Sequence, residues 1–226
     1  TGGNTDTKFY ASLAYNKQLG IAYDQGLERI TGNANLQHSF GRFDLQVTTQ
    51  LSRTRQDLAN EGTSFTSPIM NYAWVQNPSS TPYNDDGTLN DGGLFGVNPI
   101  FERDHSSDVY TFTKAFSTVK LTYNIWDNLK LSEKIAYDYF DGTEDVLWDK
   151  FSNDGGPGGV MQRDKLSYQQ LNSQTQLTYE KTFGQHNVNA LLGFETENFV
   201  NSDNYVSGQK YPGQLYEFGN AAETNA

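Results

Sequence analysis

In the stretch Phe43-Asp44-Leu45-Gln46-Val47-Thr48-Thr49-Gln50-Leu51-Ser52, apolar and polar residues alternate with a period of two. Successive side chains of a β-strand point to opposite faces, so one face of this strand is largely apolar and the other is polar throughout. Burying the polar face in a dry core would cost about 2–7 kcal/mol for each group left without a partner. The stretch therefore predicts a strand with one face in water and the other in an apolar medium.

Six further segments show the same alternation, with Glu133 as an exception because it falls on the apolar face of its segment. These segments cover residues 9–16, 30–40, 109–125, 129–139, 171–179 and 188–195. A tilted strand needs about 9–11 residues to cross a bilayer, and several of the segments reach that length. The pattern predicts an all-β chain with about seven long strands.

The connections between these segments alternate strictly between short and long. The short ones lie around Gly41, Asp127-Asn128 and Gly184-Gln185, where turn-forming residues occur. The long ones cover about 19–28, 57–107 and 142–167, and a tail follows Val200. Outer-membrane barrels have short periplasmic turns and long extracellular loops. The rhythm therefore predicts an antiparallel transmembrane β-barrel segment in the outer membrane of a Gram-negative bacterium.

The composition narrows the class of protein without deciding it. The 226 residues include 14 Tyr, 14 Phe and 3 Trp, with 35% hydrophobic residues and a mean hydropathy of -0.69. A net charge of -11 argues against nucleic-acid binding, and the absence of cysteine excludes disulfides and thiolate metal sites. No apolar run reaches the ~20 residues of a transmembrane helix. A soluble β-sandwich that binds glycans has a similar composition and stays open as the alternative.

An odd number of strands indicates that the barrel continues beyond this chain. Bacterial barrels usually have an even number, and a membrane sheet must close because unpaired backbone groups are costly in lipid. We expect residues 1–226 to be part of a single barrel domain, with any plug and the remaining strands elsewhere. Aromatic residues near the strand ends would form interface girdles. They are Phe9, Tyr15, Phe40, Phe43, Tyr123, Trp126, Tyr137, Tyr139, Tyr179, Phe183 and Phe194.

The opening segment resembles the SusC/RagA family of TonB-dependent outer-membrane transporters of the Bacteroidota. The likeness runs through Thr5-Asp6-Thr7-Lys8-Phe9-Tyr10, Ser12-Leu13-Ala14-Tyr15, Gln18, Gly20-Ile21, Glu28-Arg29, Asn35-Leu36, Pro82-Tyr83-Asn84-Asp85-Asp86-Gly87 and Leu191-Leu192-Gly193-Phe194-Glu195. Leu27 stands where the family has an aromatic residue, and Gly32 interrupts the strand that follows.

This resemblance implies a barrel of about 22 strands around an N-terminal plug. It also implies energy from the TonB-ExbB-ExbD system through the plug and a SusD-like surface lipoprotein as a lid. The implied substrate is an oligosaccharide or a peptide. The chain is expected to be part of a nutrient importer and not an enzyme.

Four aromatic residues are the candidate contacts for a ligand or a partner: Tyr72, Trp74, Tyr83 and Trp148. They fall in the two longest predicted loops. Aromatic faces stack on sugar rings or pack against a protein lid, and they equally pack within a long loop. Both readings remain open for these side chains.

No cofactor, metal site or catalytic group is expected. Residues 85–92 resemble a calcium loop but lack the closing Glu, so they predict a turn. His38, His105 and His186 are too scattered for a metal site. The acidic loop residues Glu144, Asp145 and Asp149 could contact a ligand but are not expected to catalyse glycoside hydrolysis. Residues 155–159 are Gly-rich and predict a flexible loop tip.

Overall fold

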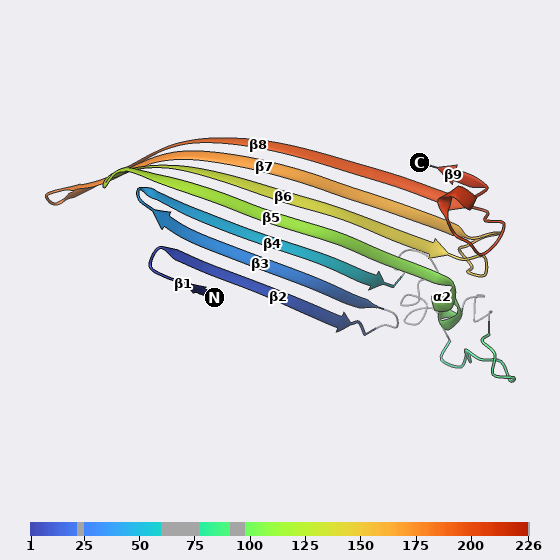
Figure 1. Ribbon diagram of the computed structural model, residues 1–226. Helices are drawn as coiled ribbons and strands as arrows, with labels where there is room; N and C mark the ends of the chain where they lie inside the picture. Colours follow the sequence, from blue (N-terminus) through green and yellow to red (C-terminus); the bar gives the residue numbers. More distant parts are fainter. Residues whose placement is uncertain (22–24, 60–76, 91–97, 226) are drawn as a thin grey trace.

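One antiparallel β-sheet holds most of the regular structure in the computed structural model, which describes residues 1–21, 25–59, 77–90 and 98–225. Its strands lie side by side in chain order (Figure 1). They are β1 (Gly2–Gly3), β2 (Thr7–Leu19), β3 (Gly26–Phe40), β4 (Phe43–Leu58), β5 (Ser106–Trp126), β6 (Leu129–Trp148), β7 (Val160–Phe183), β8 (His186–Gln209) and β9 (Glu223–Asn225). The helix α2 (Pro99–His105) and the 3-10 turn η3 (Phe218–Asn220) complete the described elements. Strands β2 to β8 are the seven long strands that the alternation predicts.

The short and long connections lie at opposite ends of the sheet (Figure 1). Two-residue turns join β3 to β4, β5 to β6 and β7 to β8, at the predicted positions. Gly41 and Gly184 adopt φ values of 60° and 61°, which glycine takes without the steric cost that a Cβ would bring. We call the two ends of the sheet the turn end and the loop end.

The register places the two kinds of side chain on separate faces. Val47 lies opposite both Leu36 on β3 and Val119 on β5, which in turn lies opposite Ile135 on β6. The neighbouring positions carry Gln46 opposite Lys120 and Lys120 opposite Lys134. We call these the apolar face and the polar face. Leu13, Leu192 and Phe194 on the apolar face are 80%, 72% and 68% exposed.

No second sheet covers either face within the described ranges, because all nine strands belong to one sheet. The buried hydrophobic side chains there are limited to Phe140 and Tyr211. A β-sandwich needs two sheets packed over a shared core. The described fold is a single sheet, as expected for a segment of barrel wall, and gives no support to the sandwich alternative.

No described helix is long and apolar enough to cross a membrane.

The strands run further toward the loop end than the alternation predicts. The connection between β6 and β7 covers 149–159 instead of 142–167, and β8 continues past Val200 to Gln209. The predicted tail also contains a short returning strand, since Ser207 of β8 lies opposite Asn225 of β9. Backbone hydrogen bonds continue the ladder after polar residues appear on both faces. The side-chain pattern therefore fades before the strands end.

Glu133 lies on the apolar face, as its position in the alternation indicates. The Ser173 hydroxyl on β7 donates a 2.6 Å hydrogen bond to one carboxylate oxygen of Glu133, and the Thr175 hydroxyl donates to the other. These hydroxyls on β7 satisfy the carboxylate within the sheet, so the exception does not disrupt the strand.

Replacing Gly184 by Ala should destabilise the protein by about 1–2 kcal/mol, because an L-residue is strained at a left-handed φ. Gly213→Ala is the matched control, since Gly213 has open space around its Cα and no positive φ. Urea unfolding of the full-length protein measures both free energies. Equal destabilisation by the two variants would contradict the role assigned to Gly184.

Candidate functional site

A row of aromatic rings crosses four strands on the polar face near the loop end. Tyr110 and Phe112 of β5 have ring centroids 5.1 Å apart, and Phe112 lies 5.8 Å from Phe140 of β6. Tyr168 of β7 lies 5.1 Å from Phe140 and 6.0 Å from Phe199 of β8. We call these five residues the aromatic row. They form an apolar band on a face that is otherwise mainly polar.

The aromatic row is packed against the sheet at Gly142. A Cβ at this position would lie 2.8 Å from the Tyr110 hydroxyl and 2.9 Å from the Phe140 ring, so the rings occupy the space of a side chain. Phe140 is consequently only 7% exposed. The Lys114 ammonium lies 5.4 Å from the ring centroids of both Phe112 and Phe140. This geometry is that of a cation–π contact.

Three carboxylates border the aromatic row on its loop side. Asp108 of β5 precedes Tyr110 by two residues, Glu144 of β6 lies opposite Tyr110, and Asp164 of β7 lies opposite Glu144. We call Asp108, Glu144 and Asp164 the acidic border. Burial, and after it the interaction with the neighbouring Glu144 carboxyl, together raise the pKa of the Asp108 carboxyl to about 6. None of the three carboxylates forms an ion pair among the described residues.

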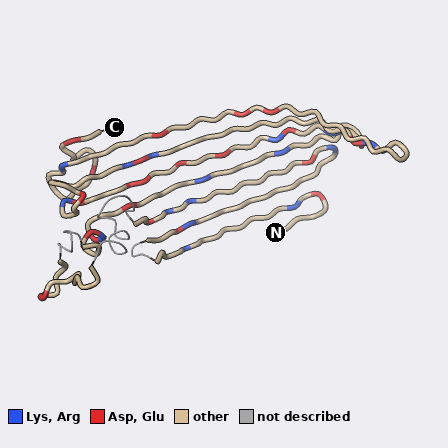
Figure 2. The backbone as a smooth tube through the Cα atoms, turned by 180° about the vertical axis from the view of Figure 1, so that it is seen from behind, with Lys and Arg blue, Asp and Glu red and all other residues tan. Residues whose placement is uncertain are grey.

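The nearby cations of β7 belong to the other face. Arg163 pairs with Asp145 at 2.5 Å, and Lys165 pairs with Asp141 at 3.4 Å. These positions alternate with those of the acidic border, so the register carries the two basic side chains away from it. Figure 2 shows charged residues of both signs toward the loop ends of β6 and β7. The strands therefore place the ion pairs on one face and the unpaired carboxylates on the other.

Beyond the strands, α2 holds two loop segments together. The Asn98 side chain accepts from the Ile100 backbone N–H at 3.0 Å and donates to the Pro82 carbonyl at 2.8 Å. The buried Glu102 carboxylate accepts from the Ser152 hydroxyl at 2.7 Å and from the Asn153 backbone N–H at 3.0 Å. The helix thereby joins the 77–90 segment to the 149–159 loop in one cluster.

The Gly-rich segment 155–159 packs against neighbouring backbone instead of projecting as a loop tip. The Tyr211 backbone N–H donates to the Gly158 carbonyl at 3.2 Å. A Cβ on Gly155 would lie 1.7 Å from the Asp149 carbonyl oxygen, and one on Gly158 would lie 2.8 Å from the Lys210 Cα. The glycines permit this close approach of backbone segments.

The four predicted aromatic contacts have different locations. Tyr72 and Trp74 lie outside the described residues. Tyr83 forms a β-bridge with Leu89 across the predicted turn and is 50% exposed. Trp148 ends β6 opposite Val160 instead of lying in a loop, and its buried indole N–H has no acceptor among the described atoms. The structure therefore places Tyr83 in a loop turn and Trp148 in the sheet.

The predicted acidic loop group is divided by the strand. Glu144 and Asp145 are consecutive in β6 and point to opposite faces, so they are not loop residues. The Asp149 carboxylate forms a 2.7 Å hydrogen bond with the ring nitrogen Nδ1 of His105. Within the described ranges, no three His, Asp or Glu side chains converge as metal ligands.

The aromatic row was not predicted from the sequence. The sequence feature that could have revealed it is the position of Tyr110 and Phe112 in β5. Both fall on the same face of this strand as polar residues such as Thr118 and Lys120. Two aromatic residues at successive positions of the polar face indicate a place where this face becomes apolar.

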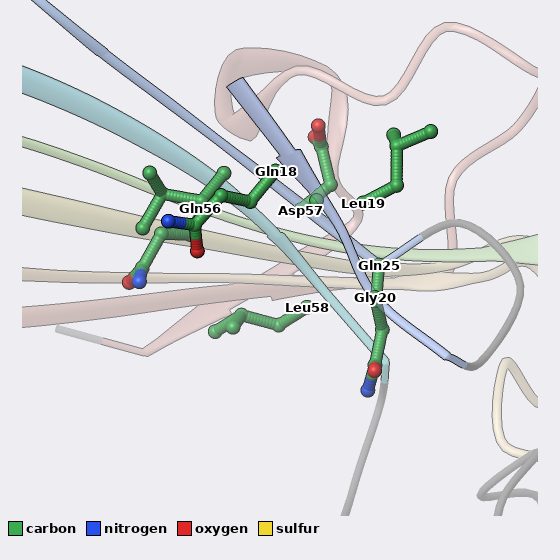
Figure 3. Close-up of a pocket in the computed structure, with 9 residues that line it drawn as sticks. Gln18, Leu19, Gly20, Gln25, Gln56, Asp57 and Leu58 are labelled. Atoms are coloured by element: carbon green, nitrogen blue, oxygen red, sulfur yellow. The ribbon is translucent and has the colours of Figure 1, made fainter. Parts of the chain in front are cut away.

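A hollow of about 250 Å³ lies where the loop ends of β2, β3 and β4 meet. Figure 3 shows Leu19 and Asp57 on one side of the strands and Leu58 on the other. Asp57 is the charged residue of its lining and pairs with Arg55 at 2.9 Å. The described lining of this hollow offers a ligand no charged contact other than Asp57.

Comparison with known proteins places this sheet in a class of barrels. The chain is 23% identical over 231 residues to TonB-dependent receptor P3 of Formosa agariphila. The matched region covers 93% of this chain and 22% of that protein. The RagAB peptide importer in its closed-closed state superposes with a TM-score of 0.77 at 13% identity, over 98% of this chain and 26% of the importer chain. The chain has the fold of a RagAB-type barrel wall.

A second RagAB structure, the open-open state of the importer, gives the same result. Its TM-score is 0.75 at 14% identity, over 98% of this chain and 26% of that one. No family model matches the sequence. The chain thus fits a fragment of a SusC/RagA-like transporter and spans about a quarter of the length of these relatives. The matched proteins are receptors and importers and not enzymes, which agrees with the expectation from the sequence.

Replacing Phe140 by Ala should destabilise the full-length protein by about 3 kcal/mol, because it removes the most buried ring of the aromatic row. Phe116→Ala is the matched control, since Phe116 of β5 lies on the polar face like Phe140 but is 40% exposed. Its expected cost is below about 1 kcal/mol. Denaturant unfolding measures both, and an equal cost for the two variants would show that the row contributes no packing.

The raised pKa of Asp108 predicts a pH-dependent effect of Asp108→Asn. The folded state holds the proton more tightly than the unfolded state, so this carboxyl favours folding below about pH 4 and loses that contribution as the pH rises through about 6. The Asn variant should therefore gain stability relative to the parent between pH 5 and pH 8. Unfolding titrations at these two values measure the gain. A variant whose stability tracks the parent at both values would contradict the assignment.

Proposed function

We propose that the chain forms part of the wall and outer rim of a TonB-dependent nutrient importer in the outer membrane of a Gram-negative bacterium. The polar face lines the interior and the apolar face contacts lipid. The turn end lies in the periplasm and the loop end outside the cell. The observation that carries this proposal is the exposed apolar face on a sheet whose connections are sorted by length.

The turn end of the apolar face has the chemistry of a membrane interface. His38, Phe40, Phe43 and Tyr123 stack across three strands, with centroid separations of 5.4, 5.4 and 4.8 Å. Aromatic rings at this position match the girdles that border the apolar band of membrane barrels. Phe40, Phe43 and Tyr123 were predicted for this role from the sequence.

The whole protein would supply the parts that drive import. We propose that residues 1–226 belong to a single barrel domain, and that a plug elsewhere in the protein couples it to the TonB-ExbB-ExbD system. A SusD-like lipoprotein would cover the loop end. The similar proteins are described as a TonB-dependent receptor and as a peptide importer. We propose an oligosaccharide or a peptide as the substrate class, and the peptide importer among the similar proteins supports the second.

The loop cluster around α2 is the part of this chain that would face such a partner. It combines the 77–90 segment with the 149–159 loop through Asn98 and Glu102. Tyr83 and Phe151 are 50% and 49% exposed on it. Tyr72, Trp74, Tyr83 and Trp148 remain our proposed contacts for a ligand or a partner.

Arginine on the two faces of one strand tests this function. Leu191 and Leu192 are consecutive in β8, are 64% and 72% exposed, and point to the polar and apolar faces. In a bilayer, Leu192→Arg should cost about 2–4 kcal/mol, while Leu191→Arg faces the interior and should cost less. Heat-modifiable gel mobility and unfolding in lipid vesicles measure assembly of the full-length variants.

A soluble protein would treat both substitutions as ordinary surface changes. If Leu191→Arg and Leu192→Arg assembled equally well, or if the parent fractionated with soluble periplasmic proteins, the membrane assignment would be wrong.

A further inference from the structure

The aromatic row and the acidic border form one continuous surface on the polar face. The row crosses β5 to β8, and the border crosses β5 to β7 directly on its loop side. A separation of two residues along a strand is about 7 Å, so the carboxylates lie within one side-chain length of the rings. Under the proposed function this surface faces the interior near the external mouth. A substrate that enters the barrel would meet it.

The ring geometry disfavours a sugar as the occupant. Sugars stack on the free face of an aromatic ring. Phe140 and Tyr168 are stacked on each other with an interplanar angle of 11°. Lys114 lies over the rings of Phe112 and Phe140. Neighbouring groups thus occupy ring faces of Phe112, Phe140 and Tyr168, and the rest of the row is an apolar surface against which alkyl or aromatic side chains can pack.

The charge of the border favours a cation. Glu144 and Asp164 are directly opposite each other on neighbouring strands, where like charges are destabilising. Asp108 adds a third carboxyl, whose buried Oδ1 atom has no hydrogen-bond partner among the described residues. The basic residues Arg163 and Lys165 pair on the opposite face and leave the border uncompensated. A positively charged group bound here would relieve the repulsion between the carboxylates.

The Lys114 ammonium beside the aromatic row indicates which kind of ligand side chain this surface accommodates. The Lys114 ammonium lies over the ring of Phe112 on its own strand and over the ring of Phe140 on β6. A lysine or arginine side chain of a ligand combines an apolar stem with a charged end. Its stem could lie along the row and its charge could reach the border.

From this complementarity we infer that the aromatic row and the acidic border bind a basic peptide, with a lysine or arginine at Asp108 and Glu144 and a neighbouring apolar side chain on the row. The inference rests on the proposed function and narrows its substrate class to peptides with positive charge.

Binding to the purified full-length protein in detergent tests the inference. The probes are the peptide acetyl-Lys-Phe-Arg-Phe-amide, its acidic counterpart acetyl-Glu-Phe-Glu-Phe-amide, and maltohexaose. Isothermal titration calorimetry should give an affinity for the basic peptide at least about tenfold above that for the acidic one, equivalent to about 1.4 kcal/mol. Added salt should weaken binding of the basic peptide.

A pair of double variants isolates the acidic border. Asp108→Asn/Glu144→Gln should weaken binding of the basic peptide about tenfold, since it removes the charges that face the ligand. The control variant Asp141→Asn/Asp145→Asn removes two carboxylates of β6 that lie near Glu144 along the strand but on the opposite face. This control should bind the basic peptide within about twofold of the parent. Heat-modifiable mobility verifies that both variants are folded.

Three results would overturn the inference: equal affinity for the two peptides, an unchanged affinity in Asp108→Asn/Glu144→Gln, or tight binding of maltohexaose that the basic peptide cannot displace. These results are separate from a failure of the proposed function. The arginine variants of β8 and fractionation decide whether the protein is a membrane barrel, whereas the titrations use purified protein and report only on the ligand.

Discussion

The register of the antiparallel ladder is the constraint on which the rest of this structure depends. Gln46, for example, lies opposite Gln37 on one side and Lys120 on the other, so each polar position continues from strand to strand. A slip of one residue at a two-residue turn would exchange the faces of the next strand and place charged groups in the apolar band. The backbone conformation of Gly41 and Gly184 therefore has consequences for side chains many residues away.

Cross-strand contacts between aromatic rings occur in two arrays, one on the apolar face and one on the polar face. His38, Phe40, Phe43 and Tyr123 stack on the apolar face at the turn end. The aromatic row stacks on the polar face at the loop end and includes the most buried apolar side chain of the described sheet, Phe140. Cross-strand stacking has similar geometry in both because strand spacing sets it. The neighbouring side chains give each array its role: hydrophobic residues around the first and carboxylates around the second.

The sequence was sufficient to predict the seven long strands, their turns and their two faces, because a period of two is a local property. It was insufficient at the loop end, where both faces carry polar groups and the alternation fades before β6 ends at Trp148. The aromatic row was missed because its rings come together only after four strands pair. The contact between Glu102 and Ser152 joins residues 50 apart and leaves no local pattern. The positions of Tyr72 and Trp74 lie outside the described residues, so their prediction stays untested.

The order of the strands also has a kinetic meaning. Two-residue turns close the hairpins β3–β4, β5–β6 and β7–β8, whereas residues 59–105 separate β4 from β5. The entropy of loop closure grows with the logarithm of length, so the β4–β5 pairing costs about 3 kcal/mol more to initiate than a hairpin by flexible-chain scaling. The wall is thus expected to form as local hairpins that then join. The seam between β4 and β5, which crosses the middle of the sheet, is the slowest to nucleate.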